Sequence, residues 1–172
     1  MTSLPTRLLG RKAPLEVFVV DDDAVARCPV VRRLRRQGAR VTTFDTAEAA
    51  LLLARGTQPD LLVIDLDLPG MTGFEAAEAL SSDQACQQIP LLVVSRRDDE
   101  RTRLAAFAVG AQAFLAKPCD LDELEAVTVW LLERRGPSAA RERATALLRD
   151  AIEEARRGPL VRPRPHLPLL DG

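Results

Sequence analysis

The chain has 172 residues, 47% of them hydrophobic, and a formal net charge of −1. This length suits one domain with an appendage, and this apolar content is enough to bury a core. The balance of charge provides no general attraction to nucleic acid or to an anionic membrane, and 3% aromatic residues are too few for a base-stacking surface. Because the apolar runs are also short, we expect no direct nucleic-acid binding and no membrane insertion.

The N-terminus and the cysteines indicate a cytoplasmic protein. Residues 1–14 lack the apolar core and cleavage site of a signal peptide and are interpreted as an N-terminal extension. The three cysteines are widely spaced, and the single histidine, His166, lies far from them. We therefore expect reduced cysteines and neither a disulfide framework nor a zinc site.

Short apolar runs alternate with longer helical patterns up to residue 135. In chain order, strands are predicted at 15–20, 40–44, 61–64, 89–94 and 113–116. Helices are predicted at 25–37, 46–55, 73–80, 99–109 and 120–135, with Gly38, Gly56 and Gly110 as stop signals. Five strands alternating with five helices predict an α/β fold, in which a doubly wound parallel sheet has helices on both faces.

Three features qualify this pattern. Pro29 lies inside the first helix and is expected to kink it or to delay its start. The arginines of that helix are expected on its solvent side. Asp23, Thr46 and Asp120 are expected to cap the helices that follow them.

The domain is predicted to span residues 15–136, where Gly136 and Pro137 end the alternation. Residues 137–157 then predict an amphipathic helix, and residues 158–172, with four prolines, predict an extended and flexible tail. We leave open whether the helix packs on its own domain, on a second copy or on a partner. The stretch after Gly136 is too short for a winged helix and shows no helix-turn-helix pair.

Polar side chains stand at the carboxyl ends of four predicted strands. They are, in chain order, Asp21, Asp22 and Asp23, then Asp65, Ser95 and Lys117. Because the carboxyl ends of parallel strands meet at one edge of the sheet, we expect these side chains to lie together. Each alone could be a helix cap, a loop ligand or a solvated charge. Together, the acids, the hydroxyl and the ammonium group indicate a phosphoryl-transfer site.

The chemistry of such a site needs a cation, because clustered carboxylates repel one another. Mg²⁺ prefers oxygen ligands, and Asp22 and Asp65 could supply carboxylates while a backbone carbonyl near Asp67 supplies a third ligand. One carboxylate could attack phosphorus and form an acyl phosphate. Lys117 and the hydroxyl of Ser95 could then bind phosphoryl oxygens.

Four segments of this sequence resemble the receiver domain of two-component response regulators, the CheY-like family. They are VFVVDDDA, PDLLVIDLDLPGMTGFE, IPLLVVS and GAQAFLAKPCD. The resemblance covers about residues 16–135 and implies a flavodoxin-like (βα)5 fold. It implies that Asp65 is the phospho-acceptor, that Asp22 binds the metal directly, with Asp21 behind it, and that Asp67 contributes its backbone carbonyl. The implied metal is Mg²⁺, or Mn²⁺ in its place.

The resemblance also implies a switch. Ser95 is the switch hydroxyl, Phe114 the switch aromatic, and Lys117, followed by a cis Pro118, the conserved-type lysine. A sensor histidine kinase, a phosphotransfer protein or a small acyl phosphate donates the phosphoryl group to Asp65. The phosphoryl group then draws the hydroxyl inward, and the aromatic ring rotates toward the vacated space.

The output of a receiver of this kind is a protein contact, and the protein is not a turnover enzyme on external substrates. The expected partner is a downstream protein, or a second copy bound through residues 99–134 or through the helix at 138–157. An alternative is an adaptor that keeps the fold and works without phosphorylation. A haloacid-dehalogenase-like phosphatase fits the Asp-x-Asp spacing of DLDLP, but its acids occur in a different order and no cap domain is evident.

Arg96 and Arg97 depart from the family pattern, which usually has a small residue after the switch hydroxyl. They could attract the donor phosphate, obstruct its access or point to solvent. The sequence leaves these alternatives open.

Overall fold

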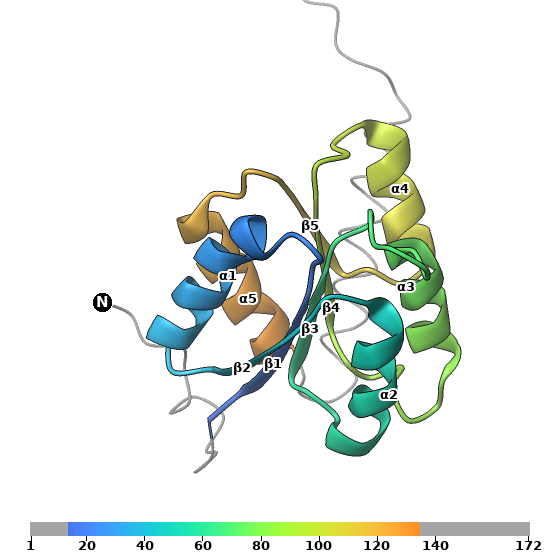
Figure 1. Ribbon diagram of the computed structural model, residues 1–172, viewed down its shortest axis with the longest axis horizontal. Helices are drawn as coiled ribbons and strands as arrows, with labels where there is room; N and C mark the ends of the chain where they lie inside the picture. The colour runs from blue at the N-terminus through green and yellow to red at the C-terminus, as the bar shows by residue number, and fades with distance from the viewer. Residues whose placement is uncertain (1–13, 135–172) are drawn as a thin grey trace, which may run out of the picture. The chain divides into compact units, whose positions relative to one another are not determined.

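A computed structural model of the chain describes residues 14–134. These residues form one sheet of five parallel strands in the order β2-β1-β3-β4-β5, with helices on both faces (Figure 1). The strands are β1 (Glu16–Val20), β2 (Arg40–Phe44), β3 (Leu61–Ile64), β4 (Leu91–Ser95) and β5 (Ala113–Ala116). This order is that of the flavodoxin-like doubly wound fold, and it confirms the predicted fold class.

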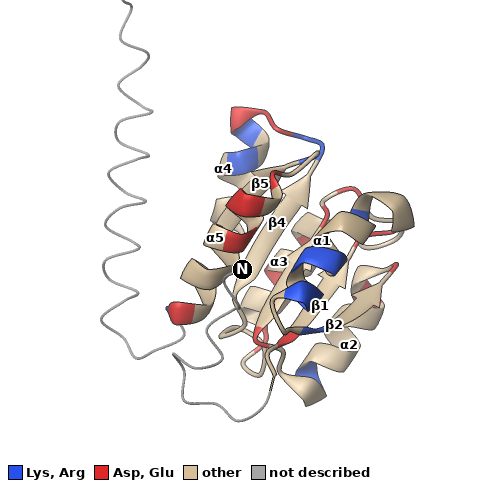
Figure 2. Ribbon diagram, turned by 90° about the vertical axis from the view of Figure 1, so that its left-hand side faces the viewer, with Lys and Arg blue, Asp and Glu red and all other residues tan. Residues whose placement is uncertain are grey.

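The helices divide between the two faces of the sheet (Figure 1). One face is covered by α1 (Ala24–Arg36) and α5 (Leu121–Glu133), and the other by α2 (Ala47–Thr57), α3 (Gly73–Ser82) and α4 (Glu100–Ala108). Basic residues gather on α1 and acidic residues on α5 (Figure 2), and Arg33 of α1 donates hydrogen bonds to Asp122 and Glu125 of α5.

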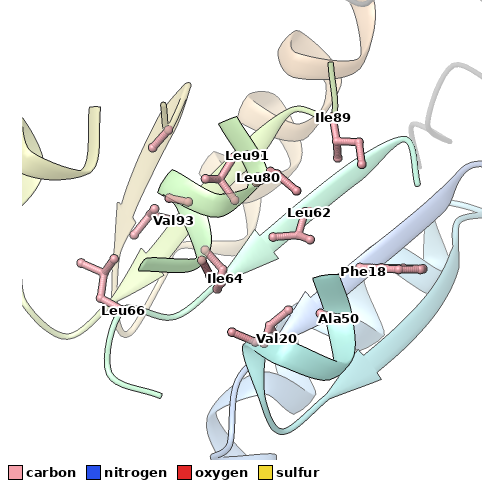
Figure 3. Close-up of a cluster of buried hydrophobic side chains, with 14 of the residues drawn as sticks. Phe18, Val20, Ala50, Leu62, Ile64, Leu66, Leu80, Ile89, Leu91 and Val93 are labelled. Carbon is pink, nitrogen blue, oxygen red and sulfur yellow. The ribbon is translucent and has the colours of Figure 1, made fainter. Parts of the chain in front are cut away.

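The core consists of two apolar clusters, one on each face of the sheet. Phe18 and Val20 of β1 point into the cluster beneath α2 and α3 (Figure 3), whereas Val17 and Val19 point into the cluster beneath α1 and α5. This alternation is the two-residue repeat of a strand. Since both faces are covered, the central strands β3 and β4 are buried at every position, which is why apolar runs indicated them, whereas the edge strand β2 keeps exposed polar residues.

The first helix differs from expectation in its start. It begins at Ala24 and continues through Pro29 to Arg36, so the expected delay does not occur. Asp23 caps it as predicted, with its carboxylate accepting hydrogen bonds from the N–H groups of Val25 and Ala26. This cap and the burial of the helix's apolar side offset the single backbone donor that proline removes.

The predicted helix stops are right in two cases and wrong in one. Gly38 and Gly110 follow the ends of α1 and α4 with positive φ angles of 90° and 109°. Gly56 instead lies inside α2, and the left-handed residue that ends this helix is Gln58, with φ of 49°. Thr46 occupies the cap position of α2 but makes no capping hydrogen bond.

The fourth strand is shifted relative to its prediction. It begins at Leu91 rather than at Ile89, because Pro90 has no N–H to donate to the ladder and contributes only its carbonyl, which accepts from Leu62. The strand also continues one residue further than expected, so that Ser95 belongs to β4 itself.

Several predictions concern residues outside the described range. These are the extension before residue 14, the amphipathic helix at 137–157 and the tail at 158–172, all of which stay predictions. Within residues 14–134, no helix is both long enough and apolar enough to cross a membrane.

Candidate functional site

The register of the sheet brings three of the predicted side chains to one point on its carboxyl edge. Val20 lies opposite Ile64 in the pairing of β1 with β3, so the residues that follow them, Asp21 and Asp65, are neighbours. The N–H of Asp65 donates to the carbonyl of Val20 at 2.9 Å, and the N–H of Lys117 donates to the carbonyl of Ser95 at 2.8 Å. These bonds extend the ladders past the strand ends and fix the backbone from which the side chains project.

The ammonium group of Lys117 lies between two buried carboxylates. Its Nζ is 2.7 Å from Oδ2 of Asp21 and 2.5 Å from Oδ2 of Asp65. The three side chains are 10%, 6% and 1% exposed, in the order Lys117, Asp21 and Asp65. Burial by itself would lower the pKa of Lys117, but the hydrogen bonds and charges of the two carboxylates outweigh it and raise this pKa. The lysine therefore carries its charge throughout the neutral range.

Each of these carboxylates also accepts a backbone hydrogen bond on its other oxygen. Oδ1 of Asp65 accepts from the N–H of Asp67 at 3.2 Å, and Oδ1 of Asp21 accepts from the N–H of Asp23 at 3.0 Å. Both side chains are thus held in fixed orientations. A carboxylate held in this way is preorganised as a nucleophile or as a metal ligand.

The remaining members of the predicted metal set are exposed. Asp22 is exposed, and its side chain has no hydrogen-bonding or ionic partner among residues 14–134. In that same range, no three His, Cys, Asp or Glu side chains are grouped closely enough to hold a metal by themselves. The predicted set needs only the carboxylates of Asp22 and Asp65 with the carbonyl of Asp67. This composition fits a hard cation that keeps several waters, such as Mg²⁺.

Ser95 and Phe114 lie nearby but outside the carboxylate–lysine cluster. The hydroxyl oxygen of Ser95 is fully buried and accepts from the N–H of Arg97 at 3.2 Å. The ring of Phe114 on β5 is already buried in the core, and the guanidinium of Arg103 lies 4.9 Å from its centroid. The peptide bond between Lys117 and Pro118 is cis, as expected from the resemblance.

Two residues that position the site were missed by the sequence analysis. Gly73, the first residue of α3, packs so closely that a Cβ there would lie 2.2 Å from the carbonyl oxygen of Asp65. Arg27 of α1 was expected in solvent, yet its guanidinium donates to the carbonyls of Asp21 and Phe44. A glycine opening a helix is a poor helix former and was the available signal for the first residue. No local pattern marked the second.

Arg96 and Arg97 differ in the acidic residues that they affect. Arg97 forms an ion pair with Asp67 at 3.6 Å, and its guanidinium lies 5.8 Å from the ring centroid of Phe74. Arg96 is exposed. The pKa of Asp23 is lowered mainly by hydrogen bonds from backbone N–H groups of α1, and the positive charge of Arg96 lowers it further. Arg97 therefore borders the loop after β3, whereas Arg96 affects the loop after β1 only through its charge.

A five-stranded parallel sheet with a lysine between two strand-end carboxylates defines the class of phosphorelay receiver domains. The model of the response regulator receiver domain family matches residues 17–128, and the chain belongs to this family. It is a two-component signalling protein of the bacterial type.

Individual proteins support this assignment. The chain is 37% identical over 123 residues to the transcriptional regulatory protein PrrA of Mycobacterium leprae. This aligned segment covers 72% of this chain and 52% of that protein. Its fold matches that of the chemotaxis response regulator CheY4 of Vibrio cholerae with a TM-score of 0.65 and 28% identity, over 70% of this chain and 100% of that one.

A third likeness concerns the fold alone. The receiver domain of sensor histidine kinase PA1611 from Pseudomonas aeruginosa matches with a TM-score of 0.66 at 23% identity, over 70% of this chain and 99% of that one. That structure has a magnesium ion coordinated in its active site cleft. The chain spans between 52% and 58% of the length of TcrX, PrrA and PhoP, three curated relatives that it matches.

Proposed function

We propose that this protein accepts a phosphoryl group on Asp65 and signals through protein contacts. The observation that carries the proposal is the ammonium of Lys117 bonded to Asp21 and Asp65 at once, at a buried edge of the sheet. A lysine in this position holds the acceptor through a charge-assisted hydrogen bond and supplies a cation for the phosphoryl oxygens. Membership of the receiver family supports the same chemistry.

In the proposed reaction an oxygen of Asp65 attacks the phosphorus of a phosphohistidine or an acyl phosphate. The new O–P bond forms as the bond from phosphorus to the donor's nitrogen or oxygen breaks, and the donor leaves with that electron pair. Lys117 exchanges its carboxylate oxygen for a phosphoryl oxygen, while Asp21 holds it in place. Mg²⁺, or Mn²⁺, bound by Asp22, Asp65 and the carbonyl of Asp67, would neutralise the charge of the transferred group.

The proposed output uses the two residues beside the cluster. The buried oxygen of Ser95 accepts from Arg97, so its own hydrogen is free to be donated to a phosphoryl oxygen. Movement of Ser95 would change the packing next to Phe114 and thereby the surface of residues 99–134. Leu104 and Trp130 are exposed on that surface, where a downstream protein or a second copy could bind. Such a switch requires about 5 kcal/mol of differential interaction to move from mostly inactive to mostly active.

The direct test is incubation with acetyl phosphate and Mg²⁺, followed by intact mass measurement. We expect wild type to gain one phosphoryl group, and Asp65→Asn or removal of the metal with EDTA to prevent the gain. Asp83→Asn is the matched control, because Asp83 follows the C-terminal end of α3, away from this edge of the sheet. A wild type that gains no mass, or an Asp65→Asn variant that gains as much, would contradict the proposal.

A second function, a phosphorylation-independent adaptor, is favoured by one observation. The side chain of Asp65 is only 1% exposed and is covered in part by Lys117, so a donor cannot reach it without local movement. Partner capture by wild type and by Asp65→Ala, each with and without beryllofluoride, separates the two functions. Equal capture in all four samples, with no mass gain from acetyl phosphate, supports the adaptor.

A further inference from the structure

The side chain of Arg97 connects the two loops between which Asp65 lies. The residue belongs to the loop after β4, and its guanidinium reaches the carboxylate of Asp67 and the ring of Phe74, which belong to the loop after β3 and to α3. Its backbone N–H donates to the hydroxyl oxygen of Ser95. Arg97 thus contacts both the switch hydroxyl and the loop that carries the acceptor.

Arg97 lies against the loop that orients the acceptor. Oδ1 of Asp65 accepts from the N–H of Asp67, and its side chain is almost completely buried. A phosphoryl group added to this carboxylate would therefore project away from the buried strand β3, toward the loops at this edge of the sheet, of which the loop after β3 contains Asp67. The guanidinium of Arg97 is held at this loop by its ion pair with the side chain of Asp67, two residues after the acceptor.

We propose that Arg97 is a phosphoryl-binding residue which Asp67 holds in reserve until Asp65 is phosphorylated. The inference rests on the proposed function and extends it to a residue to which the family resemblance assigns no role. On phosphorylation the guanidinium leaves Asp67 and pairs with phosphoryl oxygens. Because the N–H of Arg97 is bonded to Ser95, the same movement displaces the loop that begins at the switch hydroxyl.

The relative strengths of the two pairings favour this exchange. The present pair is separated by 3.6 Å, and its side chains are 52% and 40% exposed, so water screens it. The contact with Phe74 is long and partly solvated and holds the guanidinium only weakly. A phosphoryl group carries about −1.5 to −2 charges on three acceptor oxygens, which a guanidinium binds through two parallel hydrogen bonds. A carboxylate with one charge competes poorly with it.

Arg96 provides a matched control for charge. It is the adjacent residue on the same loop and is also exposed, but its charge affects Asp23, whose pKa it helps to lower. Removing either arginine takes away one positive charge near the site. Only Arg97 has the ion pair with Asp67, so a difference between the two variants reports pairing rather than net charge.

The test measures binding of beryllofluoride, a phosphoryl mimic, in the presence of Mg²⁺ by NMR titration of the full chain. We expect Arg97→Ala to weaken binding by about tenfold, as is typical of losing a charged hydrogen bond, Arg97→Lys to restore part of the loss, and Arg96→Ala to bind as wild type. The Nε–H resonance of Arg97 should shift when the mimic binds.

A double-mutant cycle tests the reserve role of Asp67. Asp67→Asn keeps the backbone carbonyl but releases the guanidinium, so it should tighten binding, and this gain should vanish in the Arg97→Ala background. Equal affinities of wild type and Arg97→Ala, or a gain from Asp67→Asn that persists without Arg97, would overturn the inference. Failure of wild type itself to bind beryllofluoride would instead overturn the proposed function.

Discussion

Replacing Gly73 with alanine should disturb Asp65, the proposed phospho-acceptor, although the substitution adds only one methyl group. Gly73 opens α3, and its N–H donates to the carbonyl of Leu66 at 3.0 Å. A Cβ at this position would lie 2.2 Å from the carbonyl oxygen of Asp65 and 2.7 Å from the Cα of Leu66. Both neighbours are backbone atoms, which cannot rotate away as a flexible side chain would.

The size of the effect follows from these distances. Non-bonded heavy atoms are comfortable at about 3.5 Å, so the helix and the loop must separate by about 1 Å. Overpacking of this kind costs about 1–3 kcal/mol, whereas alanine in place of glycine gains at most about 1 kcal/mol in a helix. We therefore expect Gly73→Ala to lower the free energy of unfolding by about 1–2 kcal/mol. The displaced backbone carries Asp65, so phosphorylation by acetyl phosphate should slow as well.

Urea unfolding followed by circular dichroism measures the first effect, and intact mass after acetyl phosphate treatment measures the second. Gly56→Ala is the matched control, because Gly56 also lies in a helix but a Cβ there meets no atom within 4 Å. This control should be stabilised by about 0.5–1 kcal/mol. If Gly73→Ala were as stable as Gly56→Ala and accepted phosphate at the wild-type rate, the close approach of α3 would not constrain the site.

Three further predictions concern charge and packing. Lys117→Gln leaves two buried carboxylates without their cation and should lower the free energy of unfolding at pH 7 by about 3 kcal/mol. Because the pKa of Lys117 is raised, the lysine's contribution is complete below about pH 10.4, so urea unfolding of the two proteins should converge as the pH rises through the raised value. Hydrogen bonds from Thr102 lower the pKa of Asp99, so stability should fall as pH drops below that carboxyl's ordinary value of 3.8, and Asp99→Asn should show a flatter acid profile. Leu124→Ala in α5 should cost about 2–5 kcal/mol in urea unfolding, whereas Leu52→Ala, at an exposed position, should cost less than about 0.5 kcal/mol.

The sequence predicted the architecture because each local signal agreed with the tertiary environment. Apolar runs became strands since helices cover both faces of the sheet, and Asp23 and Asp120 cap α1 and α5 with their carboxylates. The errors fell where local signals are weak. Gly56 destabilises α2 little, because it lies in the last turn and the helix ends at the left-handed Gln58. Pro90 has no N–H, so β4 begins at Leu91, the first residue that can donate a backbone hydrogen bond.

The meeting of Asp21, Asp65 and Lys117 could be predicted because parallel strands deliver their ends to one edge of the sheet. Their contacts could not, since these depend on distances between segments far apart in the chain. Nothing near Lys117 in the sequence indicates that it lies between Asp21 and Asp65. The close approach of Gly73 and the reach of Arg97 to Asp67 likewise arise only when helix, loop and strand are assembled.

The three consecutive aspartates after β1 show how the fold makes one residue type serve three purposes. Asp21 is buried and paired with Lys117, Asp22 is exposed without a partner among the described residues, and Asp23 caps α1. Two of the three carboxylates thus have partners within the protein: Asp21 pairs with Lys117, and Asp23 accepts hydrogen bonds from backbone N–H groups of α1. The unpartnered carboxylate follows Asp21 at the edge of the sheet that also carries Asp65, and a divalent cation bound there would relieve this surplus of negative charge. Arg97 is likewise paired with Asp67 beside this site, and we propose that it pairs instead with the phosphoryl oxygens once Asp65 is phosphorylated.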